Sequence, residues 1–60
     1  MKIVLEYDKN GHWVSLEQTG RWFSLYVDGS LKDKNMSREV GTKMYFSYVK
    51  ALESAEEASK

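Results

Sequence analysis

Hydrophobic and polar positions alternate through residues 1–27 in three short segments, which are separated by Asn10-Gly11 and Thr19-Gly20. Alternation with a period of two is typical of a β-strand that buries one face. Asn-Gly between two such segments is a strong signal for a hairpin, because both residues tolerate the positive φ of a type I′ turn. The pattern therefore predicts an antiparallel meander of three strands.

The two loops also predict a register. A two-residue first loop places Leu5 opposite Leu16, and a two-residue second loop places Leu16 opposite Phe23. A slip of one residue would move every side chain to the other face, so the agreement between the loops constrains the assignment. The predicted apolar face consists of Ile3, Leu5, Tyr7, Val14, Leu16, Phe23, Leu25 and Val27.

The opposite face carries three aromatic side chains that the core does not use. In this register Trp13 lies opposite Tyr26, and Trp22 lies opposite Glu17 with Val4 beyond it. Aromatic pairs across strands can serve stability alone. A domain of this size cannot cover both faces of its sheet, however, and exposed aromatic patches mark contact surfaces. We therefore expect a partner on this face.

The alternating hydrophobic pattern of residues 1–27 ends at Asp28-Gly29. Residues 30–35 are polar apart from Leu31, so residues 30–36 either add a short edge strand or cross the sheet. Ser37 is a suitable helix N-cap. Gly41 costs about 1 kcal/mol inside a helix, so the helix begins either after Ser37 or at Thr42.

A period of 3.6 residues follows and predicts a helix of about 16–20 residues across the apolar sheet face. Phe46 falls on its polar side and belongs either to the core, through a bent helix, or to an interface. We expect residues 56–60 to fray. The apolar stripe consists of Val40, Met44, Tyr48, Ala51, Leu52 and Ala55, with Tyr45 and Val49 at its margin.

Length and composition limit the candidate functions. The chain has 60 residues, which we assign to a single domain, with no cysteine and one histidine. A chain this short buries only about 60% of its unfolded surface, so its core is marginal. Without cysteines it has no disulfides, and we expect neither a metal site nor a cofactor. A very efficient core, oligomerisation or a bound partner would supply the missing stability.

The balance of charges makes nucleic-acid binding the less favoured of two candidate functions. Nine basic and nine acidic residues balance, whereas nucleic-acid binders usually carry a basic surplus. The aromatic face also carries Glu6, Asp8 and Glu17 against Lys2, with Arg21 as a second candidate base. Three strands followed by a helix resembles the layout of plant ethylene-response-type DNA-binding domains and of recombinase arm-binding domains. Their Arg-rich strand motifs are absent here.

Catalytic chemistry has little support in the sequence. His12 lies beside a turn and near Asp8, but no acidic pair, nucleophile motif or phosphate-binding loop accompanies it. We expect no enzymatic activity and no small-molecule substrate. No apolar run approaches the roughly 20 residues of a membrane span, and Glu6 ends the apolar opening too early for a signal peptide. We therefore expect a cytoplasmic protein without a membrane partner.

The sequence thus predicts an α+β domain, in which a three-stranded antiparallel meander carries one C-terminal helix across one face. We expect a non-enzymatic protein-interaction module of the regulator or inhibitor type that binds a protein partner or a second copy of itself. Its small size suggests a phage or mobile-element protein. The expected contact residues are Trp13, Trp22, Tyr26, Val4, Glu17 and Phe46.

Overall fold

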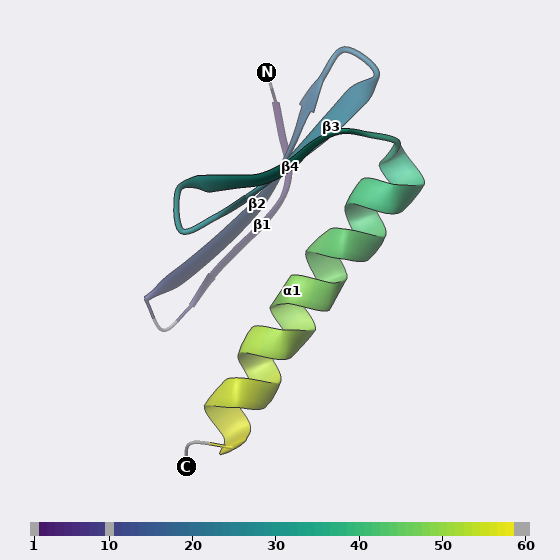
Figure 1. The fold of residues 1–60 in the computed structure, drawn as a ribbon. Helices are drawn as coiled ribbons and strands as arrows, with labels where there is room; N and C mark the ends of the chain where they lie inside the picture. The colour runs from purple at the N-terminus through teal and green to yellow at the C-terminus, as the bar shows by residue number, and fades with distance from the viewer. Residues whose placement is uncertain (1, 10, 59–60) are drawn as a thin grey trace.

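An antiparallel sheet with one C-terminal helix packed on it makes up the α+β fold (Figure 1). The computed structural model describes residues 2–9 and 11–58, with side chains through residue 55. Within these residues the sheet has four strands in the order β1-β2-β3-β4, so the prediction of three strands was wrong. The elements are β1 (Lys2–Lys9), β2 (His12–Thr19), β3 (Trp22–Val27), β4 (Ser30–Met36) and α1 (Arg38–Ala58).

The fourth strand forms because the turn after β3 reverses the chain tightly. Asp28 has a φ of 52° and Gly29 a φ of 83°, the two positive values of a type I′ turn. This turn pairs Val27 with Ser30 and leads β4 back along β3. Because β4 is an edge strand, most of its side chains face solvent, which explains its polar sequence.

The hairpin between β2 and β3 has a different register from the predicted one. Thr19 pairs with Trp22, so the loop consists of Gly20 and Arg21. Gly20 has a φ of 63°. A two-residue loop with glycine first matches a type II′ turn, whereas the predicted loop would have required a positive φ at threonine. The register therefore differs by two residues, and each side chain keeps its predicted face.

The first hairpin follows its predicted register from Leu5 onward, where Leu5 pairs with Leu16. Before Leu5 the register shifts, so that Ile3 pairs with Glu17. Val4 is the extra residue of this bulge. As a result Ile3 leaves the predicted core face and is 48% exposed. Asn10 lies outside the described residues.

The helix begins directly after Ser37, so the alternative start at Thr42 was wrong. The backbone N–H of Val40 donates to Ser37 Oγ at 3.3 Å, and the N–H of Gly41 donates to the Ser37 carbonyl at 2.8 Å. These contacts make Ser37 the N-cap. The helix has 21 residues, slightly more than predicted. The prediction that residues 56–60 fray stays a prediction. The side chains of residues 56–60 and the backbone of residues 59–60 lie outside the described part of the chain.

Gly41 and Tyr45 are the helical residues buried most deeply against the sheet. The predicted stripe was centred elsewhere, because Val40 is 51% exposed and Tyr48 is also exposed. The helix has turned so that its glycine, which has no side chain, faces the closest part of the sheet. The core consists of Val14, Leu16, Phe23, Leu25, Met36 and Tyr45, with Leu5, Tyr7, Val27, Met44, Val49 and Leu52 packed around it.

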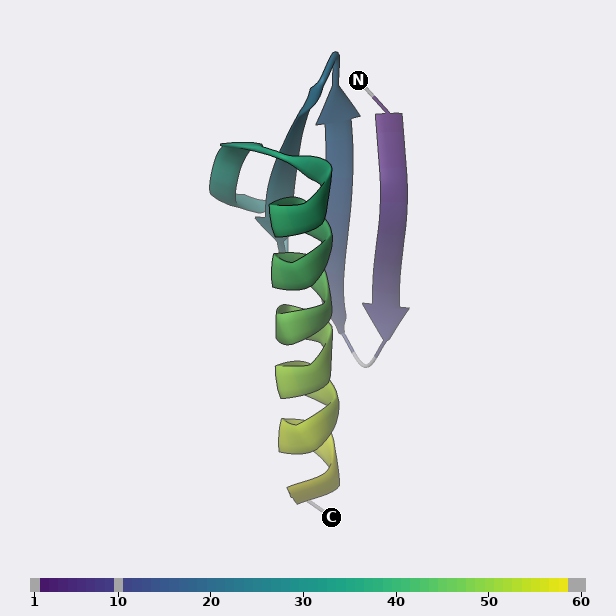
Figure 2. The same cartoon turned by 90° about the vertical axis from the view of Figure 1, so that its right-hand side faces the viewer.

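The helix covers the sheet unevenly. It runs along the middle of the sheet over β2 and β3, and β1 lies to one side of it (Figure 2). The other face of the sheet carries no helix in the described part of the chain. Both features leave surfaces free for contact.

Candidate protein-interaction surface

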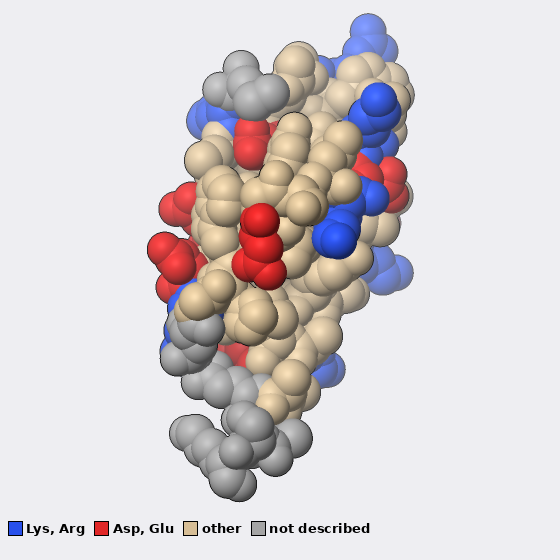
Figure 3. Space-filling model, turned by 60° about the vertical axis from the view of Figure 1, so that its left-hand side comes forward, with Lys and Arg blue, Asp and Glu red and all other residues tan. Residues whose placement is uncertain are grey.

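The sheet face away from α1, here called the open face, holds the aromatic side chains that the sequence singled out. Strand pairing assigns the residues, because directly opposed residues share a face. In Figure 3 uncharged side chains fill much of this side of the molecule, with acidic groups among them and Lys or Arg at both margins, mostly the right. The open face consists of Ile3, Glu6, Asp8, Trp13, Ser15, Glu17, Thr19, Trp22, Ser24, Tyr26 and Leu31.

Trp13 is half-buried and held at several points. Its indole Nε1 donates to Glu6 Oε2 at 2.9 Å, which directs the ring towards β1. Its backbone N–H donates to Asp28 Oδ1 at 2.9 Å, and its carbonyl accepts from the Asp28 N–H at 2.6 Å. The predicted pairing of Trp13 with Tyr26 was therefore wrong, because Trp13 lies opposite Asp28.

The carboxylate of Asp28 interacts with charged and polar groups at this end of the sheet. The hydrogen bond from the Trp13 N–H lowers the pKa of Asp28 below its ordinary value, and His12 and Lys32 act in the same direction. His12 Nδ1 lies 3.5 Å from Asp28 Oδ2. His12 thus contacts Asp28 of the neighbouring turn. Both side chains are about half exposed, so this contact contributes little to stability.

Trp22 lies at the other end of the open face. It is 49% exposed and pairs with Thr19, where the sequence had predicted Glu17. Thr19 is six residues beyond Trp13 on β2, a distance of about 20 Å along a strand. The two tryptophans therefore do not form one cluster. Each belongs to its own end of the sheet.

Between the two tryptophans lies a row across all four strands. Tyr26 pairs with Ser15 on one side and with Leu31 on the other, and Glu6 pairs with Ser15. Ser15 is fully buried although it belongs to the open face, because larger side chains cover it, and its Oγ has no hydrogen-bond partner among the described residues. Leu31 is 47% exposed, which extends the apolar surface onto β4.

Sequence reasoning missed two members of this surface. Leu31 was missed because the sequence did not decide whether residues 30–36 form a strand. Its apolar side chain within a polar segment was the available signal. Ile3 was assigned to the core because a bulge leaves no pattern in a short strand. Both enlarge the exposed apolar area beyond the aromatic residues alone.

The remaining predicted contact residues are divided between surfaces. Glu17 lies in the middle of the open face opposite Ser24, and Val4 lies in the bulge of β1 and is exposed. Phe46 is on the helix instead, where its ring meets that of Tyr45 edge to face with centroids 5.1 Å apart. It is 54% exposed, so it belongs to the surface rather than to the core.

One flank of α1 offers a second feature. A depression of about 360 Å³ is lined by Val40, Lys43, Met44 and Ser47. All four residues belong to one helix, so no second element forms an opposite wall. This depression lacks the convergent polar groups of a small-molecule site.

Comparison with protein-family models, with curated proteins and with solved structures finds no match. Within the described residues, no group of three or more acidic or histidine side chains is arranged to hold a metal ion. No helix in that part of the chain combines the length and apolar character needed to cross a membrane.

Proposed function

We propose that this protein is a small, non-enzymatic protein-interaction module whose open face binds a protein partner, either a different protein or a second copy. The observation that carries the proposal is the exposure of Ile3, Trp22 and Leu31 on a face without a helix. Each of these large apolar side chains is about half accessible to water. Burial of such groups is the main source of affinity between proteins.

The distribution of charge favours a protein over a nucleic acid. Glu6, Asp8 and Glu17 share the open face with the aromatic residues. A nucleic-acid strand stacked on those rings would bring its phosphates close to these carboxylates, which opposes binding. A protein partner can instead place its own basic or hydrogen-bonding groups against them.

The test compares two substitutions of equally exposed apolar residues. Trp22→Ser changes the open face, whereas Val40→Ser changes the outer side of α1, where the exposure is 51% against 49% for Trp22. Circular dichroism first establishes that both variants fold. Sedimentation equilibrium then measures self-association, and quantitative capture from the host measures binding of other proteins.

The proposal expects Trp22→Ser to lose the dimer or the captured protein, while Val40→Ser retains it. Equal binding by both variants would remove the open face as the contact surface. A fluorescence titration of the wild type with mixed oligonucleotides at low salt tests the nucleic-acid alternative, because both tryptophans lie on that face. A saturable change would favour that alternative.

A further inference from the structure

The two edges of the sheet differ in their capacity to accept another strand. The outer strand β4 has two register irregularities against β3, and Asn35 within it has a φ of 58°. Bulges and lysines such as Lys32 and Lys34 are the usual protection of an edge against added strands. The other outer strand, β1, is regular from Leu5 to Lys9. Only β1 therefore offers a straight edge.

The hydrogen bonds of Trp13 identify which groups of β1 point outward. Both backbone groups of Trp13 bond to Asp28, on the side of β3. Asp8, which pairs with Trp13 across β1 and β2, therefore turns its own N–H and carbonyl away from the sheet. Because bonded and non-bonded pairs alternate along an antiparallel ladder, Glu6 does the same. The edge thus presents two donors and two acceptors.

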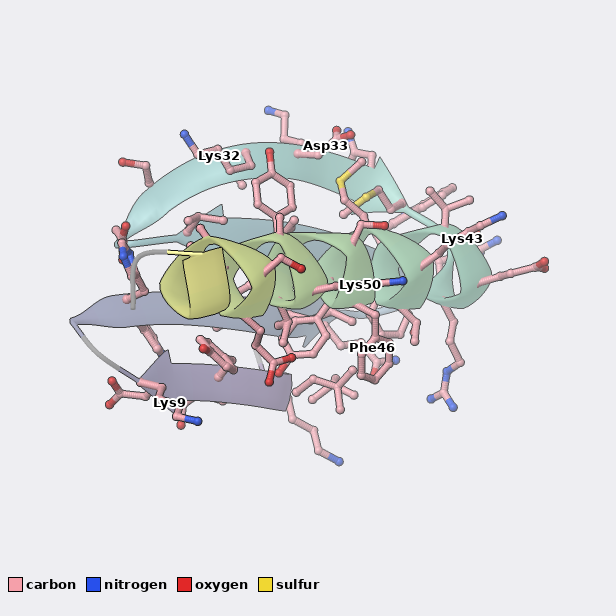
Figure 4. All side chains as sticks on the ribbon, turned by 90° about the horizontal axis from the view of Figure 1, so that it is seen from below. Lys9, Lys32, Asp33, Lys43, Phe46 and Lys50 are labelled. Atoms are coloured by element: carbon pink, nitrogen blue, oxygen red, sulfur yellow. The ribbon has the colours of Figure 1, made fainter. Side chains whose placement is uncertain are left out.

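The side chains beside this edge differ between the two faces. On the open face the edge carries the carboxylates of Glu6 and Asp8. On the helix side it carries half-buried Leu5 and Tyr7, and Phe46 projects from α1 on the side of β1 (Figure 4). An added strand would meet acids on one face and, before Lys9, apolar groups on the other.

Charge opposes pairing of this edge with the same edge of a second copy. An antiparallel pairing that uses the outward groups sets Glu6 opposite Asp8 of the copy, or sets either acid opposite its own equivalent. Directly opposed like charges destabilise a strand pair. Basic side chains on a different strand would instead complement both carboxylates.

We propose that β1 is a docking edge for an extended segment of a partner protein in which basic and apolar residues alternate. The segment adds a fifth strand beside Glu6 and Asp8, with its basic side chains on the open face and its apolar side chains towards Phe46. This mode of recognition is β-augmentation, in which backbone bonds supply affinity and alternate side chains supply specificity. The inference rests on the proposed protein-binding role and names a second surface for it.

The test uses a capped synthetic peptide of about seven residues in which valine and lysine alternate, long enough to span the regular part of the edge. Amide hydrogen exchange of the isotope-labelled full chain is followed by NMR with and without the peptide. The expected result is exchange slowed by at least about tenfold at the amides of Glu6 and Asp8. A matched peptide with glutamate in place of lysine should give no protection.

Two variants and a control separate the backbone and charge contributions. Asp8→Pro removes an outward N–H while sparing the ladder to β2, and should abolish protection at Glu6. Asp8→Lys leaves one acid and one base on the edge and should remove the preference between the peptides, and it tests the inference should the proline variant fail to fold. Asp33→Lys changes an exposed acid on the opposite edge strand and should leave binding unchanged.

Unprotected amides at Glu6 and Asp8 in the wild type with saturating lysine peptide would overturn the inference. So would protection that rises with protein concentration alone, because that indicates a second copy on the edge. Trp22→Ser should bind the peptide as the wild type does. The edge and the open face are thus tested by separate outcomes.

Discussion

Gly41 of α1 lies so close to Phe23 of β3 that a Cβ atom at Gly41 would stand 3.1 Å from the Cβ of Phe23. The same Cβ would stand 3.2 Å from Cδ1 of Leu16. Glycine therefore lets the helix approach β2 and β3 closely. Its unfavourable helix propensity is offset by the packing of the core that this approach permits.

Substitution at Gly41 tests this close approach. Alanine improves helix propensity by about 1 kcal/mol, but overpacking of a core costs about 1–3 kcal/mol. The Cβ of Phe23 is fixed to the backbone and cannot rotate away, so overpacking should prevail. We expect Gly41→Ala to destabilise the protein by about 1 kcal/mol and Gly41→Leu to destabilise it further. Urea unfolding measures both, and a more stable Gly41→Ala variant would contradict the close fit.

The N-cap at Ser37 gives a second prediction. Ser37→Ala removes the acceptor for the Val40 N–H and should cost about 1 kcal/mol, or about 4–8 °C in Tm for a domain of this size. Ser37→Asp restores an acceptor and should unfold close to the wild type. Thermal unfolding followed by circular dichroism distinguishes them. An unchanged Tm for Ser37→Ala would place the functional helix start elsewhere.

Ser15 differs from Ser37, because its substitution by alanine should not reduce the stability of the fold. Its Oγ is buried without a partner among the described residues, so removing the hydroxyl should not cost stability. We expect Ser15→Ala to be neutral or to stabilise the fold by up to about 1 kcal/mol. Urea unfolding provides the measurement. A clear loss of stability would mean that the hydroxyl has a partner, such as a bound water.

The lowered pKa of Asp28 predicts a sensitivity to acid. Its ordinary value is 3.8, and the hydrogen bond from the Trp13 N–H depresses it in the folded state. A depressed folded-state pKa contributes stability that is complete above the unfolded-state value and is lost as pH falls through the folded-state value. The loss should therefore begin near pH 4 and continue below it.

Asp28→Asn tests that contribution with the turn retained. Asparagine tolerates the φ of 52° at this position and can still accept from the Trp13 N–H. The free energy of unfolding of the variant should fall less steeply below pH 4 than that of the wild type. Parallel acid titrations that coincide would show that Asp28 makes no such contribution.

Tyr45 predicts the corresponding behaviour at alkaline pH. Burial raises the pKa of its hydroxyl above 10.0, and the charges of Glu6 and Tyr7 add to the effect. A raised folded-state pKa contributes stability that is present below the unfolded-state value and is lost as pH rises through the folded-state value. Tyr45→Phe should therefore resist unfolding above pH 10 better than the wild type, as measured by circular dichroism.

Several features followed from the sequence alone because they depend on neighbouring residues. The alternation in residues 1–27 was sufficient to assign most side chains of β2 and β3 to their faces, since a period of two depends only on parity. Ser37 was recognised as a helix cap from its place before a periodic segment. Tyr26 was correctly assigned to the face opposite the core for the same reason of parity.

The register between β2 and β3, in contrast, could be assigned only from the tertiary structure. A shift of two residues between β2 and β3 leaves every face unchanged, so the pattern could not detect it. That shift places Trp13 opposite Asp28 and separates it from Trp22 by most of the sheet. The two tryptophans therefore lie further apart on the open face than the predicted register places them.

The fourth strand and the rotation of the helix were also decided by contacts between distant residues. The polar β4 pairs because β3 offers it a free edge, which no local pattern of β4 reveals. The helix turns Gly41 inward because Phe23 and Leu16 leave no room for a side chain there. The sequence by itself determined the elements and the side-chain faces through local periodicity. The tertiary structure decided register, strand number and close approach, because these depend on which surfaces fit together.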